Sequence, residues 1–361
     1  MICRQRALRR PPGARARSAL RAQCQRRGFS LVELMVGLAI GLFLVAVMGA
    51  VYLGSRSTFV AQESGSRMQE NGRFVMDTIA YDLRMSGFRG CLGSDAVDNT
   101  LNTPGALLYN FAEPVWGARH TGAAWSPALA APANAVGALP DGDVLVVRRP
   151  TGLGWSLVGE MASPSAALTI TPTAGFAQGD LLVVADCGSG AVLQATNAGA
   201  GAAGSIQHVA GAGGVVPGVA RTALSRAYAN DARVWRMQTL IYFLANSERR
   251  SGERALWVYT NPTYNGSAQR TELVTGVERL AVTYGLDTDG DFAADRFARA
   301  DQVANWAQVV NARVELLLVG GRDAQASQTQ PYIFDGQTVA PADRKLRTVM
   351  SMLVSLRNAL P

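Results

Sequence analysis

The chain has 361 residues, of which 34 are Lys or Arg and 27 are Asp or Glu, giving a formal net charge of +7. Nine of the basic residues and none of the acidic ones precede Gly28, so the remainder carries 25 basic and 27 acidic residues. The excess positive charge therefore belongs to the first 28 residues, which argues against a nucleic-acid-binding surface in the rest of the chain.

The first predicted element is an apolar helix that begins soon after Gly28. Residues 34–53 carry no charge, and about twenty such residues can cross the roughly 30 Å hydrocarbon layer as a helix. The arginines before this run predict a cytoplasmic N-terminus, with the residues after position 56 outside the inner membrane. A secretory signal peptide fits less well, because its apolar region is shorter and no A-x-A-like site closes the run.

A single acid, Glu33, stands at the start of the apolar run. A carboxylate in lipid is costly and usually functional. Ser30 and Glu33 also fit an S-x-x-E capping box, which would explain the acid without such a function. Gly37 and Gly41 form a G-x-x-x-G motif that permits close helix approach, although ordinary membrane-helix glycines explain them equally well.

The apolar run is expected to continue as an amphipathic helix of about 55 residues in total, because apolar residues recur at steps of three and four. The expected buried positions are Met68, Gly72, Val75, Ile79 and Leu83, widened by Phe74, Tyr81, Met85 and Phe88, whereas Glu63, Arg67, Glu70, Arg73 and Asp77 mark the exposed side. Ser86 and Gly87 predict its end. Two helices with a hinge near Gly54 or Gly65 remain the alternative.

The rest of the chain is predicted to be strands and loops. An irregular region is expected at 94–140 and a flexible excursion at 197–219. Strands are expected at 143–149, 180–185, 234–244, 255–260, 279–286, 313–319 and 344–358, with a helical start at 303–309.

The N-terminal motif resembles the class III signal of type IV pilins and pseudopilins. It consists of two arginines, Gly28, Phe29 and then Glu33 at the mouth of a spanning helix. Three later segments resemble those of a PilW-type minor pilin and occur in the same order along the chain. They are the end of the helix up to Cys91, the acidic turn at 287–291 and the last residues of the expected final strand, 356–358. The resemblance implies that a prepilin peptidase cuts after Gly28, that Phe29 becomes N-methylated, and that Glu33 pairs with the methylated amine of a neighbouring subunit.

The resemblance also implies the fold and the setting. The fold would be α+β and type IV pilin-like, with a long N-terminal helix packed on an antiparallel sheet that carries a large irregular insertion. Its parts would be a leader (1–28), a transmembrane half-helix (29–55), an amphipathic half-helix (56–90) and an exported β-rich domain (91–361).

The protein would be stored in the inner membrane, with its C-terminal domain in the periplasm, and then enter the pilus fibre. Its partners would be other minor and major pilins, the peptidase, the assembly platform and a tip adhesin. A type II secretion pseudopilin and a signal-anchored periplasmic binding protein are the alternatives.

Cys91 and Cys187 are the two cysteines beyond the predicted anchor, and both would face an oxidising compartment. One disulfide between them is the simplest expectation. Two separate buried thiols are the alternative.

Acidic residues at 287–295 suggest a calcium site, because oxygen ligands on one turn suit this cation. The candidates are Asp287, Asp289, Asp291 and Asp295. A standard EF-hand is not expected, because Phe292 takes the place of its glycine; a solvated acidic turn is the alternative. Catalysis is not expected either, because His120 and His208 lie far in sequence from any paired carboxylate and no hydrolase or metalloprotease motif occurs.

Overall fold

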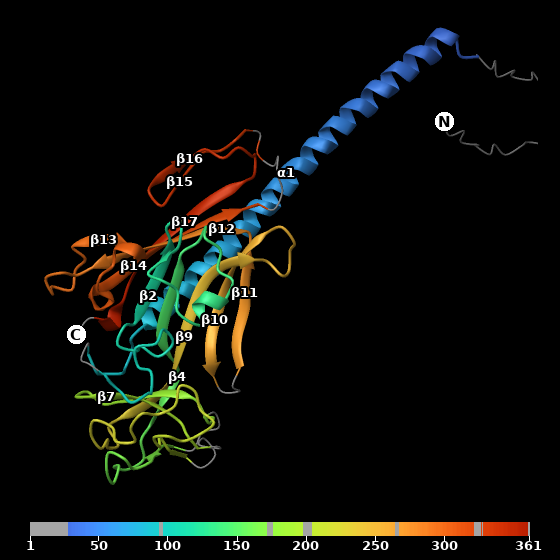
Figure 1. The fold of residues 1–361 in the computed structure, drawn as a ribbon. Coiled ribbons are helices and arrows are strands. Elements are labelled where there is room, and N and C mark those ends of the chain that lie inside the picture. The colour runs from blue at the N-terminus through green and yellow to red at the C-terminus, as the bar shows by residue number, and fades with distance from the viewer. Residues whose placement is uncertain are drawn as a thin grey trace, which may run out of the picture. The chain divides into compact units, whose positions relative to one another are not determined.

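The computed structural model describes residues 28–93, 97–171, 176–197, 204–263, 267–320, 326 and 328–359. The predicted leader therefore lies outside the described residues, apart from Gly28. The chain divides into two units, residues 1–56 and 57–361. Helix α1 (Leu31–Met85) runs through the boundary between them (Figure 1).

Helix α1 is a single helix of 55 residues that continues through Gly54 and Gly65. At its start, the Ser30 hydroxyl accepts the Glu33 backbone N–H at 3.1 Å, which satisfies one of the free N–H groups of the first turn. At its end, Gly87 takes a φ of +70°, a conformation that glycine adopts without steric cost. The predicted single helix and its stop are confirmed.

The second half of α1 buries one face and exposes the other. Met68, Val75, Ile79 and Leu83 are buried as predicted, in one cluster with residues of both large sheets. The prediction was wrong for Phe74 and Tyr81, whose side chains are 52% and 56% exposed. At about 100° per residue, these two residues lie on the opposite side of the helix from the buried positions, so their apolar character alone misled the prediction.

The larger sheet has nine strands in the order β1-β7-β6-β9-β4-β2-β3, with β10 and β11 continuing from β9. Strand β9 pairs with β4 on one edge, and its other edge pairs with β6 in its first part and with β10 in its second. The strands are β1 (Asp98–Asn99), β2 (Val115–His120), β3 (Trp125–Ser126), β4 (Val144–Ser156), β6 (Leu181–Ala185), β7 (Gly190–Gln194), β9 (Arg233–Asn246), β10 (Arg254–Thr263) and β11 (Ser267–Thr275).

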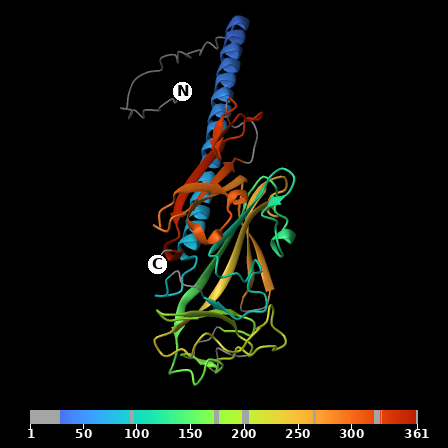
Figure 2. The ribbon, with the colours of Figure 1, turned by 60° about the vertical axis from the view of Figure 1, so that its left-hand side comes forward.

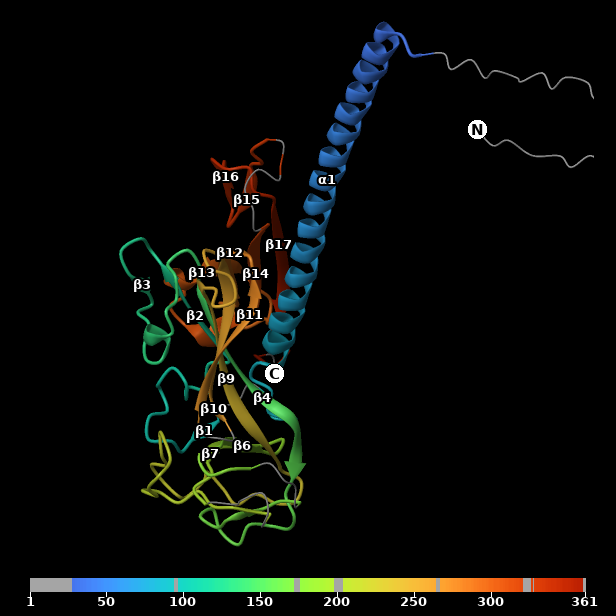
Figure 3. The same cartoon turned by 90° about the vertical axis from the view of Figure 1, so that its right-hand side faces the viewer.

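A four-stranded antiparallel sheet has the order β13-β12-β14-β17. Its strands are β12 (Val277–Leu286), β13 (Arg296–Arg299), β14 (Val309–Val319) and β17 (Arg347–Ser355), and small pairs form between β5 (Leu168–Thr169) and β8 (Ser205–Ile206) and between β15 (Tyr332–Phe334) and β16 (Gln337–Val339). Figures 2 and 3 both show the second half of α1 running alongside β17. The described residues thus form one long helix and a mostly β domain, as predicted.

Three parts of the sequence prediction need correction. The region 94–140 is not wholly irregular, because β2 pairs with β4 inside the large sheet. Residues 303–309 form no α-helix: short 3₁₀ turns cover η2 (Ala300–Gln302) and η3 (Trp306–Gln308), and strand β14 then begins. In the predicted excursion at 197–219, residues 198–203 lie outside the described part, but β8 and the buried His208 belong to packed structure.

Candidate functional site

The start of α1 contains Gly28, Phe29 and Glu33, which the sequence assigned to processing and assembly. Gly28 and Phe29 precede the first helical turn together with Ser30, and the Phe29 side chain is 78% exposed. Ser30 forms its half of the capping box, but the reciprocal bond from the Ser30 N–H to the Glu33 carboxylate is not formed among the described residues. Within the described residues, no hydrogen bond or ion pair engages the Glu33 carboxylate, which leaves it available to a partner.

The helix after Glu33 is long and apolar enough to cross a membrane by its length and composition. Its large apolar side chains are exposed from Leu31 to Leu53. A lone carboxylate at the end of such an apolar surface needs a cationic partner once it enters lipid or a packed helix bundle.

The other end of α1 is held by a buried charge cluster that the sequence did not reveal. Asp82 is 3% exposed, and its carboxylate accepts the Tyr242 hydroxyl and lies 2.5 Å from Arg149 Nε. Burial raises the pKa of Asp82, although the Arg149 guanidinium opposes this shift. The guanidinium also lies over the Tyr81 ring at 5.3 Å from its centre. The cluster joins α1 to β4 and β9.

Backbone and amide contacts complete this junction. The Gly87 N–H donates to the carbonyl of Arg148 at 3.0 Å. The Asn358 side-chain amide donates to the carbonyls of Arg84 (2.9 Å) and Ser86 (3.1 Å) at the helix end. Asn358 thus satisfies carbonyls that a helix terminus leaves free. The sequence segments around Asp82 and Asn358, 276 positions apart, meet in space.

A disulfide lies beside this junction. Cys91 and Cys187 are bonded, with their Cα atoms 4.8 Å apart across 96 positions of sequence. The bond links the segment after α1 to the turn between β6 and β7.

We expect non-reducing peptide mapping of the protein recovered from cells to yield a Cys91–Cys187 peptide pair. Reduction should lower the free energy of unfolding by at most about 4 to 5 kcal/mol, the chain-entropy limit for a loop near a hundred residues. Two alkylatable thiols in protein taken from the cell without reduction would contradict this pairing.

A second buried carboxylate, Asp143, links the two sheets. It is 5% exposed, its oxygen accepts the Val282 N–H at 2.8 Å, and Arg119 lies 3.6 Å away. Arg119 also pairs with Asp335 in the turn between β15 and β16. Burial raises the pKa of Asp143 to about 6, against the lowering effect of the Val282 N–H and of Arg119.

Because of Asp143, we expect the free energy of unfolding to fall by up to about 3 kcal/mol as pH rises from 4 to 7. The pKa of Asp143 is higher in the folded state than its ordinary value of 3.8, so the folded state holds this proton more tightly. Its stabilising contribution is full below pH 3.8 and is lost through pH 6. Urea unfolding across this range should show that Asp143→Asn flattens the profile.

The control variant for this series is Asp231→Asn, because Asp231 is exposed. Asp143→Asn keeps an oxygen for the Val282 N–H, so the fold should survive. Equal pH slopes for the wild type and Asp143→Asn would refute the assignment.

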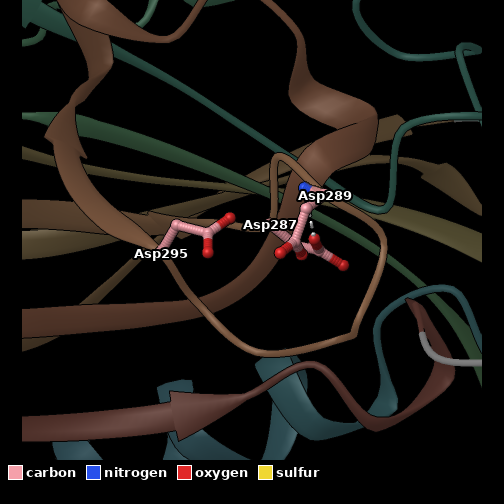
Figure 4. Close-up of side chains that lie close together, drawn as sticks. All are labelled: Asp287, Asp289 and Asp295. Carbon is pink, nitrogen blue, oxygen red and sulfur yellow. Dashed lines mark hydrogen bonds between the residues drawn. The ribbon is translucent and has the colours of Figure 1, made fainter.

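The acidic turn after β12 brings together three of the four predicted carboxylates. One carboxylate oxygen from each of Asp287, Asp289 and Asp295 lies within 4.8 Å of the other two (Figure 4). Asp291 does not belong to this group, and its carboxylate accepts the Ala293 N–H.

Backbone N–H groups and one hydroxyl of the turn already donate hydrogen bonds to its carboxylate oxygens. Asp287 accepts the N–H groups of Gly290 (2.6 Å) and Phe292 (2.9 Å), while Asp295 accepts both the N–H and the hydroxyl of Thr288. Phe292 takes a φ of +66°, the left-handed conformation in which glycine is normally favoured. The turn is therefore held by its own hydrogen bonds, and cation binding stays a prediction.

The two histidines form no catalytic arrangement with the neighbours that the structure describes. His120 stacks edge-on against Trp125 at 5.3 Å. His208 is buried, its Nε2 lies 3.0 Å from the Ala166 carbonyl, and burial lowers its pKa. Both fit structural roles.

Comparison with known families supplies the decisive observation. Residues 241–358 match the family model of type IV pilus-assembly protein W, and residues 24–49 match the prokaryotic N-terminal methylation motif. The last third of the chain therefore matches the PilW family, and its N-terminus carries a prepilin-type motif. The methylation motif and the apolar helix fit a membrane-anchored pilin, and such proteins are structural subunits, not enzymes.

Two further comparisons add little to the PilW assignment. A solved structure of a type IV-like pilin from Thermus thermophilus aligns over 82% of this chain and 99% of that one, at 12% identity and a TM-score of 0.34. This likeness is too slight to support an argument. A search of curated proteins gave no match.

The PilW match begins within β9 and ends at Asn358, so it includes the residue that caps the end of α1. The intervening region that carries the disulfide, β4 and β6 lies outside both family matches. Sequence reasoning missed Arg149 and Tyr242 as partners of Asp82, because nothing local to either residue indicates where the helix end docks.

Proposed function

We propose that this PilW-type pilin is a minor subunit that helps to prime pilus assembly or to form the pilus tip. The observation that carries the proposal is the match of its last third to a pilus-assembly protein, joined to a helix that starts next to Gly28 and Phe29. A large exported domain of about 300 residues suits an end position, where few neighbours crowd it.

We further propose the processing that this role requires. A prepilin peptidase cuts between Gly28 and Phe29, and the new amine of Phe29 is methylated. The arginines of the leader keep the N-terminus in the cytoplasm, so the β-rich domain occupies the periplasm while the protein is stored in the inner membrane. The exposed position of Gly28 and Phe29 before the first helical turn supports access for the peptidase.

In the fibre, the Glu33 carboxylate pairs with the methylated amine of a neighbouring pilin. This pairing offsets the cost of placing a carboxylate among apolar helices, and it fixes the axial register of the two subunits. The partners are other minor and major pilins, the inner-membrane assembly platform and a tip adhesin.

The test is deletion of the gene in the source bacterium, with complementation by the full chain. We expect a marked fall in sheared surface pili, restored by the wild-type chain, and the mature chain in the pilus fraction. Normal piliation combined with a loss of secreted enzymes would instead identify a pseudopilin. Normal piliation and normal secretion would identify an anchored periplasmic protein.

We also propose that the acidic turn binds Ca²⁺ through Asp287, Asp289 and Asp295. With an affinity near that of extracellular calcium modules, about 10⁻⁴ to 10⁻³ M, 10 mM Ca²⁺ would stabilise the protein by about 1 to 3 kcal/mol. Thermal unfolding with Ca²⁺ and with Mg²⁺ measures this effect. Asp289→Asn should abolish it and Asp291→Asn should not; equal unfolding temperatures with and without Ca²⁺ would refute the site.

A further inference from the structure

A groove with a volume of about 910 Å³ lies between one side of α1 and strand β17. One wall is the helix from Ser66 to Asp77, and the other is residues 348–352 of the strand. Because five consecutive strand residues line the groove, this wall is the backbone edge of β17 and not one face of its side chains. Figure 3 shows α1 and β17 side by side.

The strand wall is an open sheet edge. β17 is the last strand of its sheet and pairs with β14 over nine residues without a register shift. In the described part of the chain, no strand pairs with its other edge. Such edges are normally protected by proline, lysine or a bulge, but residues 347–355 contain none of these, and their one charge, Arg347, is held by Glu278 and Asp343.

The helix wall carries an exposed aromatic ring and three charged side chains beside this edge. Phe74 lines the groove with 52% of its side chain exposed. Glu70, Arg73 and Asp77 are exposed along the same wall, and none of the three has an ion-pair partner among the described residues. An exposed aromatic ring with unpaired charges around it is typical of a surface that another chain covers.

We propose that an extended segment of a neighbouring pilus subunit adds to the free edge of β17 as a further strand and fills this groove. The proposal rests on the pilus function proposed above. Added strands gain affinity from main-chain hydrogen bonds, and their alternate side chains enter pockets. Here, alternate side chains would cover Phe74 and the partly buried Met352.

The dimensions and charges of the groove fit this occupant. The helix wall from Ser66 to Asp77 is about 17 Å long, which matches an extended segment of about five residues. A helix, at least about 10 Å wide, would leave the backbone groups of β17 unpaired. Two acids, Glu70 and Asp77, against the single Arg73 favour a segment with a basic side chain facing α1.

Two matched variants of the full chain test the edge. Ser351→Lys places a lysine in the groove-lining part of β17, and Ser355→Lys makes the same change at the exposed end of the strand, outside the groove. We expect Ser351→Lys to lower incorporation into sheared pili at least about tenfold, with membrane levels and leader cleavage unchanged. Equal incorporation of the two variants would overturn the inference.

Cysteine variants at the same positions identify the occupant. After removal of the leader, Cys91 and Cys187 are the remaining cysteines and are bonded to each other, so one added thiol can be labelled alone. A maleimide should label Ser351→Cys in the detergent-solubilised membrane form and much more slowly in intact fibres, and it should label Ser355→Cys in both. Fast labelling of Ser351→Cys in fibres would contradict the proposal, whereas a dimer cross-linked through position 351 would identify β17 of a second copy as the added strand.

Amide hydrogen exchange distinguishes strand addition from contact by side chains alone. Alternate amides within 348–352 should exchange at least about a hundredfold more slowly in fibres than in the solubilised protein, because added main-chain bonds protect them. Unchanged exchange there would refute strand addition. Absence of the wild-type chain from pili would instead contradict the pilus function itself.

Discussion

Glu33→Ala should leave export and leader cleavage intact while incorporation into pili falls at least about tenfold. The carboxylate has no partner within the described residues, and Ser30 caps the helix without it. Removing the carboxylate therefore costs the single subunit nothing and makes its helix more compatible with lipid. In the fibre, on the pairing proposed above, the same change leaves the neighbour's amine unpaired at a buried position, which is strongly unfavourable. The mutant should accumulate in the inner membrane and be depleted from sheared pili, as quantitative immunoblots of the two fractions would show.

The matched control is Glu63→Ala, which removes another exposed glutamate from α1. Glu63 pairs with Arg67 on the surface of the helix, and an exposed pair of this kind contributes little. Its incorporation should therefore equal that of the wild type. A normal amount of Glu33→Ala in the pilus fraction would show that this carboxylate has no part in assembly.

Arg149→Met should lower the free energy of unfolding by about 3 to 5 kcal/mol, the usual cost of leaving one member of a buried ion pair alone. Asp82 would then be buried with the Tyr242 hydroxyl as its remaining partner in the cluster. The loss should be smaller at pH 5 than at pH 8, because burial already raises the pKa of Asp82 and protonation removes the unpaired charge. Urea unfolding of the full chain in detergent measures both effects.

Two comparison variants isolate the buried pair. Arg67→Met breaks the exposed Arg67–Glu63 pair on the same helix and should cost less than about 1 kcal/mol. The double variant Asp82→Asn, Arg149→Met removes both charges and should recover much of the lost stability. If Arg149→Met cost no more than Arg67→Met, the buried cluster would not stabilise the docking of the helix end.

The long helix could be predicted because its signals are local. Each signal depends only on residues that are near one another in the sequence. These signals are the uncharged run at 34–53, the apolar positions from Met68 to Leu83 and the glycine at position 87. Strands β9, β12 and β14 were also found, because each contains a run of apolar and β-branched residues. Strands β2, β7 and β11 were missed because none of them contains a comparable apolar run.

The contacts that fix the helix end could not be predicted, because they join residues far apart in sequence. In the sequence, Asp82 is an ordinary polar residue near a helix terminus. Its partners Arg149 and Tyr242 lie on β4 and β9, and only the fold places them beside it. The same holds for Phe74, whose apolar side chain suggested burial but lines an open groove. Conversely, the pairing of Cys91 with Cys187 needed no geometry, since no other cysteine lies beyond the anchor.

The mass of the mature N-terminal peptide tests the central assignment most directly. The chain should be isolated from the inner membrane and from sheared pili, digested and examined by mass spectrometry. A pilin should yield a peptide that begins at Phe29 and carries one methyl group on its amine, because the methylation motif spans residues 24–49 and the helix starts just beyond Phe29. An intact leader, or a mature chain that begins after residue 55, would contradict the assignment.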